Sequence, residues 1–180
     1  MLRASDAATR RMGALALGDV TGAPEATAAL LAGVLHQRGE SVRAAAAEAL
    51  ASIAQRDPKA AGPFLERAIG DPAHDVRAAA IRGLGTTWAR QRRPAEVAEI
   101  LESCETDSAR RLVAVEALVI QASQVGSGKA GEDAKQARNL LDRLATSGPP
   151  LARLAAQVGR AFIGARLEDM HAFFDRLYGG

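Results

Sequence analysis

An arginine–leucine pair recurs four times along the 180-residue chain at a nearly constant spacing. Successive arginines are 33, 34 and 34 residues apart, and a leucine follows each of them after seven residues. These repeat positions are Arg10, Arg43, Arg77 and Arg111, with Leu17, Leu50, Leu84 and Leu118. A period of about 20–50 residues is typical of stacked repeats, in which each unit is one small group of elements. The spacing therefore predicts an array of similar units.

The residue types indicate that these units are helical. Alanine occurs 41 times, against one tryptophan, one tyrosine and four phenylalanines. Alanine is the best helix former and allows helices to approach closely, whereas strands favour branched and aromatic residues. We therefore expect an all-α protein packed through small side chains.

Each unit reads as two helices joined by a short turn. An inner helix carries the anchor arginine, as in SVRAAAAEAL from residue 41 and DVRAAAIRGLG from residue 75. The other helix of each unit, the outer helix, opens with a proline, at Pro24, at Pro58 after the N-cap candidate Asp57, and at Pro94. Proline suits the first turn of a helix because its missing N–H would have no partner there.

Two segments carry a resemblance to a known family. The stretch DPAHDVRAAAIRGLG, preceded by FLERAIG, is similar to a HEAT repeat, and RGESVRAAAAEALASIA resembles a second one, both of the short bacterial type. The resemblance implies an α-α superhelix, a right-handed solenoid of about four to five helix pairs. It also implies that the anchor arginines tie neighbouring turns together.

The organisation along the chain follows from where this pattern weakens. We expect a single repeat domain over residues 1–180, with the clearer repeats at 5–122, a loop at 123–131, and a degenerate last repeat and cap at 132–180. The cap is a short amphipathic helix, 166–178, that would cover the open end of the array. Its apolar stripe is Leu167, Met170, Phe173, Phe174 and Leu177.

Groups able to do chemistry are sparse, so no catalytic residue, metal or cofactor is expected. Gly126, Gly128, Lys129 and Gly131 lack the spacing of a phosphate-binding loop. The three histidines have no further ligand at metal-site spacing. Cys104 is the only cysteine, which excludes a disulfide within the chain and favours a reducing, cytoplasmic compartment. No apolar run is long enough to insert into a membrane.

Two groups of residues are candidates for binding. The first is the basic turn, WARQRR, in which Trp88 stands beside Arg90, Arg92 and Arg93; such groups can stack on bases or hold phosphates and carboxylates. The second is a column five residues after the anchors, Glu48, Arg82 and Glu116. If inner helices lie about 8–10 Å apart, this column predicts an alternating ion-pair ladder on the concave face.

Three functions compete. The HEAT resemblance implies a non-enzymatic scaffold that binds a protein partner through the concave face of its inner helices. The alternatives are a nucleic-acid-binding protein, including the HEAT-like DNA glycosylases, and a bilin-lyase-like protein that handles a cofactor. A net charge of +2 is weak support for nucleic-acid binding, although residues 1–93 hold 13 Lys/Arg against 9 Asp/Glu. No motif beyond the repeat supports the third.

Overall fold

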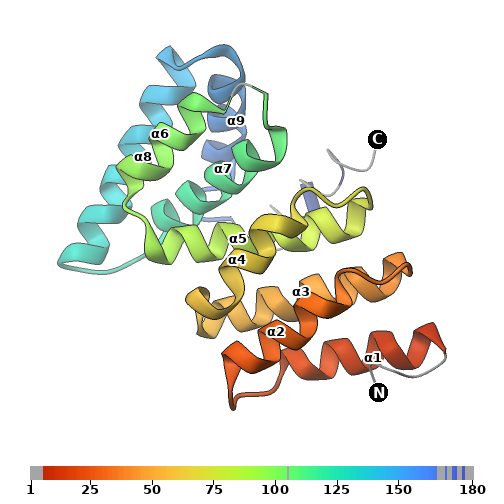
Figure 1. The fold of residues 1–180 in the computed structure, drawn as a ribbon. Helices are drawn as coiled ribbons and strands as arrows, with labels where there is room; N and C mark the ends of the chain where they lie inside the picture. Colours follow the sequence, from red (N-terminus) through yellow and green to blue (C-terminus); the bar gives the residue numbers. More distant parts are fainter. Residues whose placement is uncertain (1–5, 105, 166–168, 170–171, 174–175, 177–180) are drawn as a thin grey trace. The chain divides into compact units, whose positions relative to one another are not determined.

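The computed structural model describes residues 6–104, 106–165, 169, 172, 173 and 176. These residues form nine helices and no strand, which confirms the all-α helical-repeat class (Figure 1). The helices are α1 (Ala7–Gly18), α2 (Pro24–Val34), α3 (Glu40–Arg56), α4 (Pro58–Ala68), α5 (His74–Gln91), α6 (Pro94–Ser103), α7 (Ser108–Ser123), α8 (Lys129–Ser147) and α9 (Pro150–Ala161). The chain divides into two compact units, residues 1–87 and 88–180. The single domain expected from the sequence stays a prediction.

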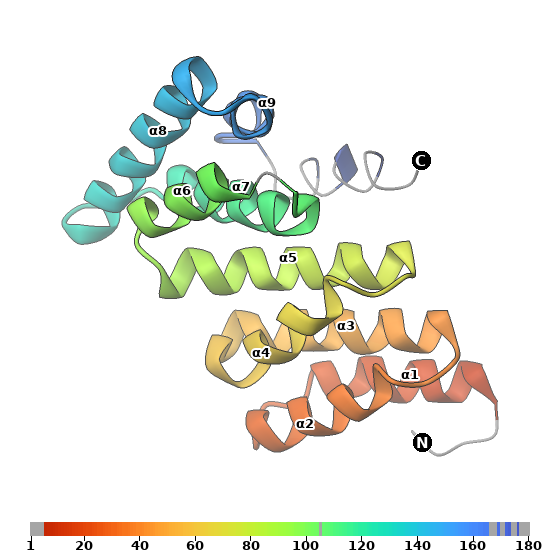
Figure 2. The ribbon, with the colours of Figure 1, turned by 45° about the horizontal axis from the view of Figure 1, so that its top comes forward.

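The first unit is built from two layers of helices. Helices α1, α3 and the first part of α5 lie side by side as inner helices, and α2 and α4 lie together as outer helices (Figure 2). The inner layer is lined with small buried side chains, among them Ala45–Ala47 and Ala78–Ala80. The runs of alanine are therefore packing residues, as the sequence predicted.

The contacts between adjacent inner helices repeat in the first unit. A methyl group added at Gly18 of α1 would lie 2.9 Å from the Cα of Ala49 in α3. One added at Gly83 of α5 would lie 2.8 Å from the Cβ of Ala51 in α3. Gly18 and Ala51 each lie eight residues after the anchor arginine of their own helix, and Ala49 and Gly83 each lie six residues after theirs. The same two repeat positions therefore meet at both contacts. A single glycine at each contact lets the backbones approach this closely.

Carboxylates cap the starts of two helices in the first unit. The Asp57 carboxylate accepts hydrogen bonds from the amides of Lys59 and Ala60, both at 3.1 Å, and Pro58 occupies the first turn of α4. The Asp6 carboxylate accepts from the Thr9 amide at 2.7 Å at the start of α1. These bonds satisfy amides that have no partner within the helix.

The second unit contains α6 to α9 and the end of α5. Helix α6 packs on α7 and α8, and α9 packs on α7 and α8. The Arg143 guanidinium of α8 lies 2.7 Å from the Glu102 carboxylate of α6, and the Gln157 amide of α9 donates to the Ala145 carbonyl of α8 at 3.0 Å. The last helices thus continue the paired arrangement beyond the clear repeats.

The expected loop is shorter than the sequence suggested. Helix α7 continues to Ser123, and α8 begins at Lys129 rather than Glu132. Gly128 has φ +66°, a conformation open to glycine, so the chain turns there and the helix starts directly afterwards. Of the expected cap, Asp169, Ala172, Phe173 and Arg176 are described; Leu167, Met170, Phe174 and Leu177 lie outside the described residues.

Candidate functional site

The anchor arginines bind the turns that precede their own helices. Arg43 and Arg77 each donate to the carbonyls five and six residues earlier, and Arg111 donates twice to the carbonyl seven residues earlier. The acceptors are the carbonyls of Gln37 and Arg38 for Arg43, Asp71 and Pro72 for Arg77, and Cys104 for Arg111. Turn carbonyls at a helix end lack backbone partners, so these guanidinium groups stabilise the connection between outer and inner helix.

Arg43 also reaches the following turn. Its Nε and Nη2 donate to the two carboxylate oxygens of Asp71, each at 2.9 Å, across 28 residues of sequence. Both side chains are 13% exposed. Asp71 accepts in addition from the Ala73 amide at 2.8 Å. Arg43 therefore joins two successive turns.

The ionisation of this pair is shifted toward the charged forms. Burial alone would raise the pKa of Asp71, but the Arg43 hydrogen bonds, the Ala73 amide and the nearby guanidinium charges hold it below its ordinary value. The hydrogen bond to Asp71 raises the pKa of Arg43. A carboxylate held in this way is a structural group and a poor general base.

The leucines of the repeat lie in the hydrophobic core. Leu50, Leu84 and Leu118 are at most 1% exposed, whereas Leu17, in the first inner helix, is half-buried. Among the described helices, α1 packs against one inner helix, α3, whereas α3 lies between α1 and α5, which agrees with this difference in burial.

The predicted charged column is not uniform in its environment. Glu48 is exposed, Arg82 is half-buried, and Glu116 is 1% exposed. Glu48 and Arg82 therefore remain accessible to a partner, whereas the Glu116 carboxylate does not. The ion-pair ladder stays a prediction.

Most of the basic turn interacts with its own surroundings. Trp88 is 3% exposed, and the Arg92 guanidinium carbon lies 4.9 Å from its ring centroid, a cation–π contact. The Arg93 Nε donates to the Glu96 carboxylate at 2.8 Å, and this bond lowers the pKa of Glu96. Arg90 is exposed. A buried indole cannot stack on a base, so this turn is a weaker nucleic-acid site than its sequence suggests.

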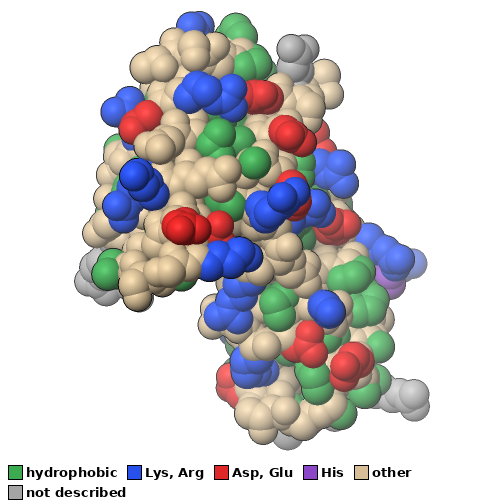
Figure 3. All heavy atoms as spheres, turned by 90° about the vertical axis from the view of Figure 1, so that its left-hand side faces the viewer, with side chains coloured by type: hydrophobic (Ala, Val, Ile, Leu, Met, Phe, Trp, Pro, Cys, Tyr) green, Lys and Arg blue, Asp and Glu red, His purple; other side chains and the backbone are tan. Residues whose placement is uncertain are grey.

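Charges of both signs are mixed on the surface. On the face drawn in Figure 3, Lys/Arg and Asp/Glu side chains are interspersed rather than gathered by sign. A groove that binds several phosphates needs a patch dominated by positive charge. This face has no such patch.

Histidine and cysteine do not converge in the described part of the chain, which holds no cluster of three metal-ligating residues. His36 is exposed, and His74 Nδ1 lies 3.1 Å from the Asp75 carboxylate, whereas His171 lies outside the described residues. Burial, followed by the Asp107 charge, raises the pKa of the Cys104 thiol. A thiol of this kind is a poor nucleophile because the reactive thiolate is disfavoured.

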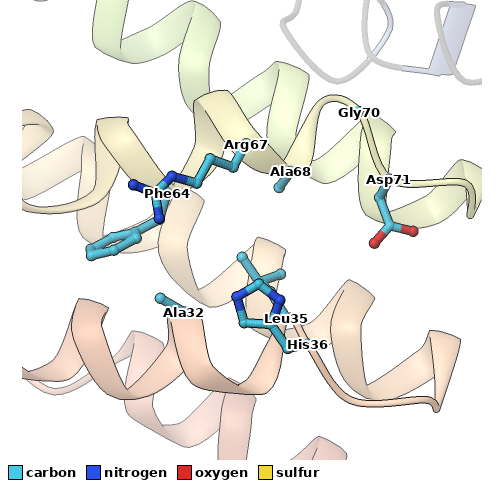
Figure 4. A pocket seen from close by; sticks show the side chains of 8 residues that line it. All are labelled: Ala32, Leu35, His36, Phe64, Arg67, Ala68, Gly70 and Asp71. Carbon is cyan, nitrogen blue, oxygen red and sulfur yellow. The ribbon is translucent and has the colours of Figure 1, made fainter.

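A cavity lined by described residues lies in each unit. In the first unit, a cavity of about 180 Å³ lies between the outer helices, with Phe64 and Arg67 of α4 facing Ala32, Leu35 and His36 at the end of α2 (Figure 4). Its carboxylate, Asp71, is already held by Arg43. This volume is below the roughly 300–1,000 Å³ of typical small-molecule sites. Its other polar side chains are those of His36 and Arg67.

The cavity of the second unit has a volume of about 370 Å³ and lies beside Cys104. Its lining also includes Leu101, Glu102, Pro149 and Leu151. Glu102 is bound to Arg143, and the Cys104 thiol is held in its neutral form. The ionisable side chains named at this cavity are therefore paired or neutral.

Two structurally important residues were missed by sequence reasoning. Asp71 joins two turns, and Gln121 is 3% exposed and donates to the carbonyls of Ala89 and Arg92 at the end of α5, at 3.1 and 2.8 Å. The one available signal for Asp71 was its place in an Asp-Pro turn. The sequence carries no signal for the role of Gln121, because a polar residue near a helix end normally faces water.

Comparison with known proteins supports the repeat. The family model for HEAT repeats matches residues 40–119, from the start of α3 into α7. A comparison with curated proteins gave no match. None of the helices formed by the described residues has the length and apolar content needed to cross a membrane. Residues 40–119 of this chain are therefore similar to HEAT repeats.

Proposed function

We propose that the protein is a non-enzymatic scaffold that binds another protein through the exposed face of its inner helices. HEAT repeats form helical scaffolds that commonly mediate protein interaction. The observation that carries the proposal is the placement of Glu48 and Arg82. They occupy the same repeat position on adjacent inner helices, and both are accessible.

The packing beneath this face favours a binding role. Helices α3 and α5 are held by the buried leucines and by the close glycine contact, so the side chains above them keep a fixed spacing. A rigid surface binds with less loss of conformational entropy. Opposite charges at equivalent positions would select a partner with the complementary charge order.

The proposal includes the absence of catalysis and a cytoplasmic location. Asp71 is held by Arg43, Cys104 is neutral, and Glu96 is paired with Arg93, so the groups best able to react are engaged in structural roles. The single cysteine argues for a reducing compartment.

The first test is capture of partners by the tagged full-length chain from the native lysate, with and without nuclease treatment. We expect the same protein to be retained under both conditions, and to be lost with Glu48→Lys. Glu66→Lys is the matched control, since it makes the same charge change at an exposed site on outer helix α4. Retention of nuclease-sensitive material alone would instead support the nucleic-acid alternative.

A further inference from the structure

The first helix pair and its turn expose three large apolar side chains. Met12 is 61% exposed, Leu30 is 58% exposed and Val20 is 41% exposed. The described residues include six exposed large hydrophobic side chains, and these three come from α1, α2 and the turn between them. We call this surface the leading edge and define it as Ala8, Met12, Ala16, Val20, Ala26 and Leu30. An exposed apolar patch of this kind often marks an interaction site.

The repeat register shows what such a face is built to contact. Met12 lies two residues after its anchor arginine, the position that Ala45 and Ala79 occupy at 1% and 2% exposure. Ala16 lies six residues after its anchor, like Ala49, which meets Gly18 of the preceding inner helix. In a later repeat, these positions face the preceding inner helix. In α1, the same positions are exposed at the leading edge.

The outer helix gives the same result independently. Leu30 of α2 lies 34 residues before Phe64 of α4. Phe64 faces the preceding outer helix, where Ala32 and Leu35 line the shared cavity (Figure 4). Both layers thus expose, at the leading edge, the side that would receive another helix pair.

We propose that the leading edge binds a second copy of this chain, edge to edge, in a two-fold dimer. In α1, Ala8, Met12 and Ala16 are spaced by four residues and form one stripe, with a small residue on each side of the methionine. In an antiparallel pair of α1 helices centred on Met12, each Ala8 meets Ala16 of the other copy. A two-fold interface must be self-complementary in this way.

The charges on α1 agree with this pairing. A two-fold axis places identical groups near each other, so a charged residue at its centre would repel its own copy. The stripe has no charge within the helix. The nearest ionisable side chain, Arg11, lies about 100° around the helix from Met12, and Asp19 lies beyond the end of α1.

Sedimentation velocity of the full-length chain over a concentration series tests the dimer. We expect a monomer–dimer equilibrium, and Met12→Glu should raise the dissociation constant by at least about tenfold because two carboxylates would face each other. The matched control is Leu154→Glu in α9, since Leu154 is 60% exposed against 61% for Met12. A monomer at every concentration, or a dimer that only the Leu154 variant weakens, would overturn the proposal.

Cross-linking separates the two-fold dimer from head-to-tail growth. In a Cys104→Ser background, Met12→Cys places identical thiols near the axis, and oxidation with diamide should link two chains into a covalent dimer. Leu154→Cys in the same background should remain mostly monomeric. Weak cross-linking of the Met12→Cys variant, non-covalent oligomers longer than a dimer, or equal cross-linking of both variants would contradict the two-fold arrangement.

Discussion

Arg43 and Asp71 show how one side-chain pair can set the spacing between successive repeats. The guanidinium binds both carboxylate oxygens at 2.9 Å and also two carbonyls of its own turn. Both side chains are mostly buried, so their interaction is less screened by solvent than that of a surface ion pair. The geometry of two turns therefore depends on the charge of a single carboxyl group.

Removing that charge should destabilise the protein in a pH-dependent way. At pH 7, Asp71→Asn should lower the free energy of unfolding by about 1–3 kcal/mol, because a charged hydrogen bond is lost. The pKa of Asp71 is depressed in the folded state, so its contribution is full above the unfolded value and is lost as the pH falls through the folded one. The difference between wild type and variant should therefore shrink below about pH 4.

Urea unfolding monitored by circular dichroism between pH 7 and pH 2.5 measures this difference. Asp19→Asn is the control, since it removes the same charge from an exposed position in the same unit. A wild-type–Asp71→Asn difference that stays constant over this range would refute the role assigned to the carboxylate.

Sequence reasoning identified the arginine of this pair but not its partner. The 34-residue spacing marks Arg43, while the pairing depends on how the turn before α5 folds back, which no local pattern encodes. The column of Glu48, Arg82 and Glu116 shows the same limit. Equal repeat positions have unequal burial because the neighbours of each helix differ.

Adjacent inner helices approach closely only because each contact in the first unit contains a glycine. At Gly18 the neighbour is Ala49, and at Gly83 it is Ala51, with the Leu65 Cδ1 also 2.8 Å from an added methyl group. Glycine normally weakens a helix by roughly 0.5–1 kcal/mol relative to alanine. Its presence here indicates that packing outweighs helix propensity.

The substitution Gly83→Ala should consequently destabilise the protein by about 1–3 kcal/mol, because the methyl group meets the backbone of Ala51 as well as its side chain. Gly33→Ala should instead stabilise it by about 0.5–1 kcal/mol, since nothing lies within 4 Å of a methyl group there and the residue is in α2. Chemical denaturation of the two variants provides the comparison. The same sign for both would show that packing at Gly83 is looser than described.

Helix positions were easier to predict than the turns between them. Pro24, Pro58 and Pro94 marked the starts of α2, α4 and α6 correctly, because proline has a strong positional preference. The start of α8 was placed three residues late at Glu132. A cluster of glycines suggests a loop, yet only Gly128 takes up a positive φ there.

Across the array, the cost of a core substitution should depend on the position of its repeat. Leu50 is completely buried between neighbours, so Leu50→Ala should lower the free energy of unfolding by about 2–5 kcal/mol. Leu17 is half-buried in the first helix, and Leu17→Ala should cost less than about 2 kcal/mol. Equal losses in denaturant titrations would argue against an end effect.

The net charge of +2 and the mixed charges on the face drawn in Figure 3 predict weak DNA binding, which can be measured. At about 150 mM salt we expect no saturable binding of a labelled random duplex up to about 50 µM protein, and little change at lower salt. Fluorescence anisotropy with wild type and an Arg90→Ala, Arg93→Ala double variant provides the test. A steep salt dependence that the double variant reduces would favour the basic turn as a phosphate site.

The alternation of glycine and alanine between inner helices has a consequence for lengthening the protein. In the first unit, each junction pairs one glycine with one alanine, Gly18 with Ala49 and Ala51 with Gly83. A tandem duplication of residues 40–73 would place Ala51 of the first copy against Ala49 of the second. Two methyl groups would then occupy a space that admits one. The inserted repeat would therefore need Ala49→Gly in order to pack against the preceding inner helix.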